Sequence, residues 1–123
     1  MPGDSKSRFS IRPGYVLVER PQDYEVVLSE QPAELARISG FCKEAGCREV
    51  LILGSGTRVR LSTTEIFQLG EEIANLGLKI AVVESHDASK GNVKFLENVV
   101  TNRGFSIRFF DNEREAKDWL GVA

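Results

Sequence analysis

The sequence is poor in the residues from which metal sites and disulfide frameworks are built. It contains one histidine, His86, and two cysteines, Cys42 and Cys47, among 123 residues. If one helix runs through both cysteines, their side chains lie about 140° apart around its axis, which suits neither a disulfide nor a shared metal ion. We therefore expect two reduced thiols that behave as small apolar residues, and we predict no metal and no cofactor.

Long apolar runs and an excess of positive charge are also missing. No apolar stretch approaches the roughly 20 residues needed to cross a bilayer. The 16 Lys and Arg residues against 18 Asp and Glu residues give a net charge of −2, and the basic residues are scattered along the chain. The first residues lack the apolar core of a signal peptide. We therefore expect a cytoplasmic protein with no membrane span and no nucleic-acid partner.

Apolar runs of strand length do recur, and a helix-like segment follows each of them. These runs cover residues 24–28, 49–53, 78–83 and 105–110. A further run, 15–20, precedes them, and the turn signal Pro21-Gln22-Asp23 predicts a hairpin between 15–20 and 24–29. The pattern predicts one α/β domain with the order β-β-α-β-α-β-α-β-α. Its five-stranded sheet should be mostly parallel, with an antiparallel N-terminal strand.

Residues 1–14 contain two prolines, two glycines and three serines without any apolar period. This composition predicts a mobile N-terminal arm, so that the folded domain covers residues 15–123.

Cap signals and apolar stripes predict where the helices begin and end. A first stripe ends at Gly46, and the capping box Ser62-Thr63-Thr64-Glu65 opens a helix that Gly77 ends. A third helix should carry Val93, Leu96 and Val100 on one face. Asp111 or Asn112 should cap a last helix, with Ala116, Trp119 and Leu120 directed inward.

Several of these segments together resemble the STAS-like group of α/β domains, the fold of bacterial anti-sigma-factor antagonists. The resemblance covers about residues 15–121 and includes the opening hairpin. It rests further on Val50-Leu51-Ile52-Leu53, Leu61-Ser62-Thr63-Thr64-Glu65-Ile66-Phe67, Gly77-Leu78-Lys79-Ile80-Ala81-Val82-Val83, Phe109-Phe110-Asp111 and Glu115-Ala116-Lys117-Asp118-Trp119-Leu120. It implies a stand-alone, non-catalytic interaction or regulatory domain with a protein partner, in which the helix from Thr63 to Leu76 and the loop before it present the contact surface.

The chain departs from the antagonists at two positions. They carry an aspartate at the end of the central strand, where this chain has Gly54. They also carry a phosphorylatable serine followed by Ser-Gly, where this chain has Ser62-Thr63-Thr64-Glu65. These departures argue against a target of a partner-switching kinase. Ser62, Thr63 and Thr64 nevertheless lie at the start of a helix, where an added phosphate is electrostatically tolerated, so Ser62 is kept as a candidate phosphosite. Its alternative role is that of an N-cap contributing about 1 kcal/mol.

A glycine-rich loop gives the chain a second candidate function. Gly54, Ser55 and Gly56 follow a buried strand at its carboxyl end, where parallel sheets bind ligands, and Arg58 lies just beyond. The spacing matches no dinucleotide or P-loop motif, so a plain flexible loop is the alternative. His86 lies beyond the next strand, at the same edge. Together they would form the mouth of a module that binds a small apolar or anionic metabolite.

An enzyme is the third class of function to consider. Ser85, His86 and Asp87 are adjacent, and neighbouring residues of an extended segment point to opposite sides, so they should not form a catalytic triad. A more distant nucleophile such as Ser55 stays open, although no nucleophile-elbow motif occurs. We predict no catalytic residue.

The last apolar run carries information about assembly. In 105–110 one face should be buried and the other half exposed, which is typical of a sheet edge. The aromatic at its end favours contact with a second subunit, so we expect a homodimer.

Overall fold

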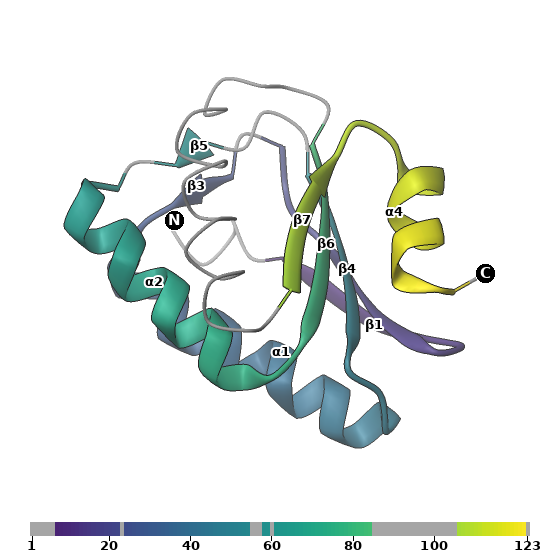
Figure 1. Cartoon of the computed structure of the whole chain (residues 1–123). Helices are drawn as coiled ribbons and strands as arrows, with labels where there is room; N and C mark the ends of the chain where they lie inside the picture. Colours follow the sequence, from purple (N-terminus) through teal and green to yellow (C-terminus); the bar gives the residue numbers. More distant parts are fainter. Residues whose placement is uncertain (1–6, 23, 55–57, 60, 85–105, 123) are drawn as a thin grey trace.

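The computed structural model describes residues 7–22, 24–54, 58–59, 61–84 and 106–122 (Figure 1). A five-stranded sheet in the order β1-β2-β4-β6-β7 forms its centre. Its strands are β1 (Arg8–Arg12), β2 (Tyr15–Glu19), β4 (Glu49–Gly54), β6 (Lys79–Glu84) and β7 (Ser106–Phe110). The helices are η2 (Leu28–Glu30), α1 (Gln31–Ala45), α2 (Thr63–Leu76) and α4 (Glu113–Leu120). A separate pair consists of β3 (Glu25–Val26) and β5 (Arg58–Val59).

Strand directions confirm the predicted mixed α/β sheet. β1 pairs antiparallel with β2 at one edge, and the pairs β2–β4, β4–β6 and β6–β7 are all parallel. β7 ends the order at the other edge, as the alternation of its residues predicts. In the centre of the sheet, Leu51 lies beside Leu17 on one side and Ala81 on the other.

The predicted hairpin between 15–20 and 24–29 is wrong. The observed hairpin joins β1 to β2, with Arg12 opposite Tyr15 across the turn Pro13-Gly14. Gly14 has φ 87°, a conformation that a glycine adopts without the steric cost of a side chain. Within the segment 24–29, Glu25 and Val26 form β3, which pairs with β5 outside the main sheet, and Leu28 begins η2.

The boundary of the predicted mobile arm, 1–14, is corrected as well. Residues Arg8–Arg12 form β1, in which polar and apolar residues alternate as in a half-buried strand. Residues 1–6 lie outside the described part of the chain, and so does the predicted helix with Val93, Leu96 and Val100.

Local capping explains where the described helices begin and end. Ser62 caps α2 in a reciprocal capping box with Glu65, and Asn112 caps α4 by accepting a hydrogen bond from the Glu115 amide. Gly46, Gly77 and Gly121 end α1, α2 and α4 in the left-handed conformation. These boundaries confirm the cap signals read from the sequence.

The end of α1 corrects the expected placement of the two cysteines. The helix stops at Ala45, and after Gly46 the chain turns back, so that the Cys47 amide donates to the Cys42 carbonyl over 3.1 Å. One helix therefore does not run through both cysteines. The angle of about 140° between them, which assumed such a helix, does not apply.

Helices cover both faces of the sheet. Figure 1 shows α1 and α2 on one face and α4 on the other. On the first face, buried strand residues such as Val50 pack with Ile38 of α1 and Ile73 of α2. On the second face, Leu51 and Ala81 pack against Ala116 of α4, and all three are 0% exposed. β4 is thus buried from both sides, as its continuous apolar run predicts.

Candidate functional site

A polar cluster lies at the carboxyl end of β2. Arg20 follows this strand, and its amide donates to the Leu53 carbonyl of β4 over 2.8 Å. Glu34 stands in the first turn of α1. Its carboxylate accepts hydrogen bonds from the Tyr24 hydroxyl at 2.7 Å and from the Ser7 hydroxyl at 3.2 Å. Residues from four separate segments are thereby joined through one carboxylate.

The charges in this cluster are largely shielded from water. The side chains of Arg20 and Glu34 are 12% and 13% exposed, and the Arg20 Nε lies 4.0 Å from a Glu34 carboxylate oxygen. The Arg20 guanidinium carbon lies 4.8 Å from the centre of the Tyr24 ring, a cation–π arrangement. The Arg20 Nε is nevertheless buried and has no hydrogen-bond partner among the described residues. The guanidinium thus has donor capacity left for an acceptor such as a phosphate or carboxylate oxygen.

The titration of Tyr24 reflects this environment. Burial, followed by the hydrogen bond to Glu34 and the charge of Glu34, raises the pKa of Tyr24 to about 12 from the usual 10.0. A phenol held neutral in this way is a hydrogen-bond donor to the carboxylate, and it is unsuited to act as a base near neutral pH.

We expect stability to fall when the pH rises through this range. Below pH 10 the phenol is protonated in the folded and the unfolded state. Between 10 and about 12 only the unfolded state loses the proton, so unfolding is favoured by up to about 1.4 kcal/mol per pH unit. Urea unfolding at several pH values measures this slope. Tyr24→Phe should reduce the slope to the part that the buried Cys42 thiol contributes, because the pKa of that thiol is raised as well. An equal slope in both proteins would contradict the assignment.

Part of the predicted ligand site lies within the described residues. Gly54 ends β4 opposite Glu84 of β6, at the carboxyl edge of the sheet as expected. Arg58 belongs to β5, where its backbone lies beside Glu25. Ser55, Gly56 and His86 lie outside the described residues, so their approach to Gly54 stays a prediction.

Ser62, the candidate phosphosite, is an exposed N-cap. Its hydroxyl accepts a hydrogen bond from the Glu65 amide at 3.2 Å, and the Glu65 carboxylate accepts one from the Ser62 amide at 2.9 Å. The structure therefore shows the capping role, and modification of Ser62 stays a prediction.

Replacing this cap should have a measurable cost. Ser62→Ala removes the acceptor for the Glu65 amide and should lower the free energy of unfolding by about 1 kcal/mol. Ser62→Asp, which retains a capping oxygen and adds charge near the positive end of the helix, should restore most of that loss. Chemical unfolding of the three proteins measures both effects. A Ser62→Ala protein as stable as the wild type would contradict the capping role.

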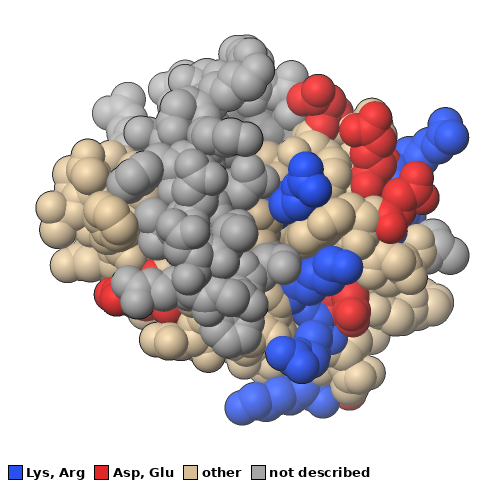
Figure 2. Space-filling view, in the orientation of Figure 1, with Lys and Arg blue, Asp and Glu red and all other residues tan. Residues whose placement is uncertain are grey.

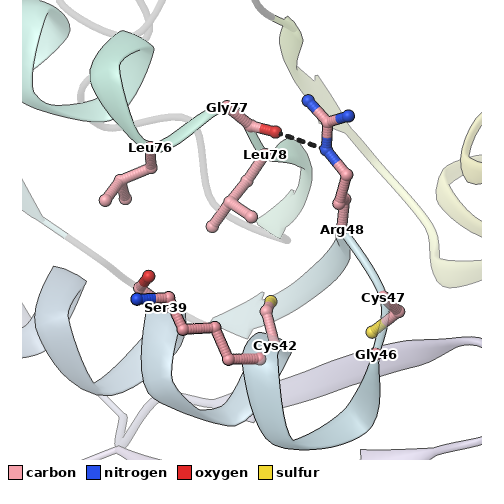
Figure 3. Close-up of a pocket in the computed structure, with 9 residues that line it drawn as sticks. Ser39, Cys42, Gly46, Cys47, Arg48, Leu76, Gly77 and Leu78 are labelled. Carbon is pink, nitrogen blue, oxygen red and sulfur yellow. Dashed lines mark hydrogen bonds between the residues drawn. The ribbon is translucent and has the colours of Figure 1, made fainter.

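A cavity of about 340 Å³ lies at the opposite end of the sheet, between the carboxyl ends of α1 and α2 (Figure 3). Its lining includes Cys42, Cys47 and Leu78. Arg48 closes one side by donating from its Nε to the Gly77 carbonyl over 2.9 Å. No motif in the sequence indicated this cavity, because the turn after α1 creates it.

The face of the molecule that Figure 2 shows carries basic and acidic side chains. Lys and Arg lie near its centre, close to where Figure 1 shows β7, and Asp and Glu lie among them and toward α4. Two basic side chains of the sheet, Lys79 of β6 and Arg108 of β7, have local partners. The Lys79 ammonium donates to the Trp119 carbonyl at 2.8 Å and lies 4.7 Å from the centre of the Trp119 ring. Arg108 lies over Phe110 in the same way, at 5.9 Å. Trp119 is half-buried against the α4-side core, where the sequence predicts a covering residue.

Neither a metal cluster nor a spanning helix occurs in the described part of the chain. Its His, Cys, Asp and Glu residues form no group of three that could hold a metal ion. Its helices are all too short or too polar to cross a bilayer. No family model matches the chain, and no curated protein matches its sequence.

Proposed function

We propose that this chain is a non-catalytic interaction and regulatory domain of the STAS-like kind, and that α2 presents its contact surface. The observation that carries the proposal is Phe67, a large aromatic on α2 whose side chain is 45% exposed. Burial of such a side chain by a partner is worth about 2 kcal/mol or more, and aromatics are typical anchors of protein interfaces.

The neighbours of Phe67 suit a contact surface. Thr63, Thr64, Gln68 and Glu71 of α2 are exposed as well, while Ile66 and Leu69 hold the helix on the sheet. An apolar anchor surrounded by polar residues on a rigid helix is the usual anatomy of a protein interface. The partner is a protein with an apolar pocket, and a second copy of the chain is the first one to test.

Site-specific photo-crosslinking tests this surface directly. A photoreactive phenylalanine is placed at Phe67, and in a control protein at Ile11, which is the other exposed large apolar residue in the described part of the chain, at 43%. We expect one discrete adduct from position 67 in the native cells, with the mass of two chains or of one chain and one partner. An adduct from position 11 alone, or from neither position, would contradict the proposal.

A binding module for a small anionic or apolar metabolite is the second candidate, and one observation favours it. The Arg20 Nε lies at the carboxyl edge of the sheet, beside the end of β4, and no described residue provides an acceptor for it. Parallel sheets bind ligands at this edge. Calorimetric titration with inorganic phosphate tests an anion site. Saturable heat that is lost in Arg20→Gln would support it, and identical weak heats in both proteins would remove this candidate.

A further inference from the structure

The turn after α1 brings the two cysteines of the chain together. Gly46 adopts φ 71°, its amide donates to the Lys43 carbonyl at 3.3 Å, and the Cys47 amide donates to the Cys42 carbonyl at 3.1 Å. This pair of hydrogen bonds is the Schellman motif, in which the second residue beyond the helix folds back onto its last turn. Cys42 and Cys47 occupy the two positions whose side chains meet in that motif.

The distance between the cysteines suits a disulfide. The hydrogen bond of 3.1 Å joins the Cys47 nitrogen to the Cys42 oxygen, and standard bond lengths then place the two Cα atoms less than roughly 7 Å apart. Disulfides bridge Cα atoms up to about this separation without backbone movement. After burial, the neighbouring Cys47 thiol is the next cause that raises the pKa of Cys42, to about 12. The two side chains therefore interact.

One of the two thiols is accessible. Cys42 is 3% exposed, whereas Cys47 is only half-buried, and both line the cavity between α1 and α2. Figure 3 shows both sulfur atoms on the cavity side of the turn. Cys47 is the more exposed of the two, so a small oxidant reaches it more readily than it reaches Cys42.

We propose that Cys42 and Cys47 form a reversible dithiol–disulfide pair that a small disulfide such as glutathione disulfide oxidises. The Cys47 thiolate attacks one sulfur of the oxidant, which forms a mixed disulfide and releases one glutathione thiolate. The Cys42 sulfur then attacks the Cys47 sulfur of the mixed disulfide, and the departing second glutathione takes up the Cys42 proton. Two cysteine thiols are oxidised by two electrons, and one glutathione disulfide is reduced to two glutathione molecules.

The disulfide between Cys42 and Cys47 would act on the contact between α1 and α2 through Arg48, the residue after Cys47. Cys47 precedes Arg48, whose Nε holds the Gly77 carbonyl at the end of α2. A disulfide would fix Cys47 on α1 and thereby restrict the side chain that joins α1 to α2. This inference does not depend on the proposed interaction function. The cysteines lie near the carboxyl end of α2, whereas Phe67 lies near its amino end.

Intact mass spectrometry of the full chain in glutathione redox buffers tests the pair. In oxidising buffer we expect the mass of the wild type to fall by two hydrogens. Iodoacetamide, added after the protein is unfolded, should then find no free thiol, and treatment with dithiothreitol should restore both thiols. Cys42→Ser should instead accumulate one glutathione adduct, at Cys47. Cys47→Ser should stay unmodified under the same conditions, because its remaining thiol is buried. Circular dichroism checks that both variants are folded.

Three outcomes would overturn the proposal. The wild type could keep two free thiols in buffers that oxidise an exposed dithiol peptide. It could retain a glutathione adduct at Cys47 that never resolves. It could also form a disulfide between two chains, which non-reducing electrophoresis separates from the internal bond.

Discussion

Leu51→Ala should lower the free energy of unfolding by about 3 kcal/mol, because it leaves a cavity in the central strand of the sheet. Leu51 is 0% exposed and packs on the α4 side between Leu17 and Ala81. Urea unfolding followed by far-ultraviolet circular dichroism measures the change.

Leu53→Ala is the matched control for this substitution. Leu53 lies on the same strand and the same face, two residues further on, but it is only partly buried. Its truncation should cost about 1 kcal/mol, because less apolar surface is lost from the core. Equal losses for both substitutions would contradict the central position of β4.

Glu34→Ala should destabilise the protein by about 3 kcal/mol, since it removes the acceptor that joins four segments. The Tyr24 and Ser7 hydroxyls lose their hydrogen bonds, and the Arg20 guanidinium, 12% exposed, loses its nearest carboxylate. Glu34→Gln retains one acceptor oxygen of similar shape, and we expect it to lose about half as much. Denaturant unfolding of both variants gives the comparison.

The same variants have a spectroscopic signature that a general loss of stability would not produce. In a Tyr15→Phe background, which leaves Tyr24 as the one tyrosine of the chain, absorbance at alkaline pH reports its ionisation. Glu34→Gln should lower the pKa of Tyr24 from about 12 while leaving it above 10.0, because burial is the larger cause. An unchanged pKa would show that Glu34 does not act on Tyr24.

Local signals allowed much of the fold to be predicted. The capping box at Ser62 and the glycines that end α1, α2 and α4 act within a few residues, so the sequence alone indicates them. The apolar runs of β4 and β6 similarly reflect burial on both faces. Elements that depend on close neighbours in the chain were therefore predicted with their boundaries.

Features that depend on distant contacts were missed. β1 contains Arg8, Ser10 and Arg12, and it becomes a strand because Phe9 and Ile11 pair with Val18 and Val16 of β2. A glycine- and serine-rich composition concealed its alternating pattern. The sequence therefore predicted an antiparallel strand at the sheet edge, but the prediction assigned this role to residues 15–20 instead of Arg8–Arg12.

The candidate site could not be read from the sequence for the same reason. Ser7, Arg20, Tyr24 and Glu34 come from four segments and match no motif, and they meet only when α1 packs beside the end of β2. The meeting of Cys42 with Cys47 depends on one left-handed glycine, Gly46. Their spacing of five residues, taken as helical throughout, predicts the opposite arrangement.

Native mass spectrometry of the purified chain tests the central claim most directly, because subunit count and bound mass come from one spectrum. That claim is that the domain works through contacts between proteins, while the cluster around Glu34 holds the carboxyl edge together. We predict the mass of the polypeptide without any small molecule, and an assembly of two chains that Phe67→Ser weakens. A monomer that carries one small molecule per chain, lost in Arg20→Gln, would contradict it.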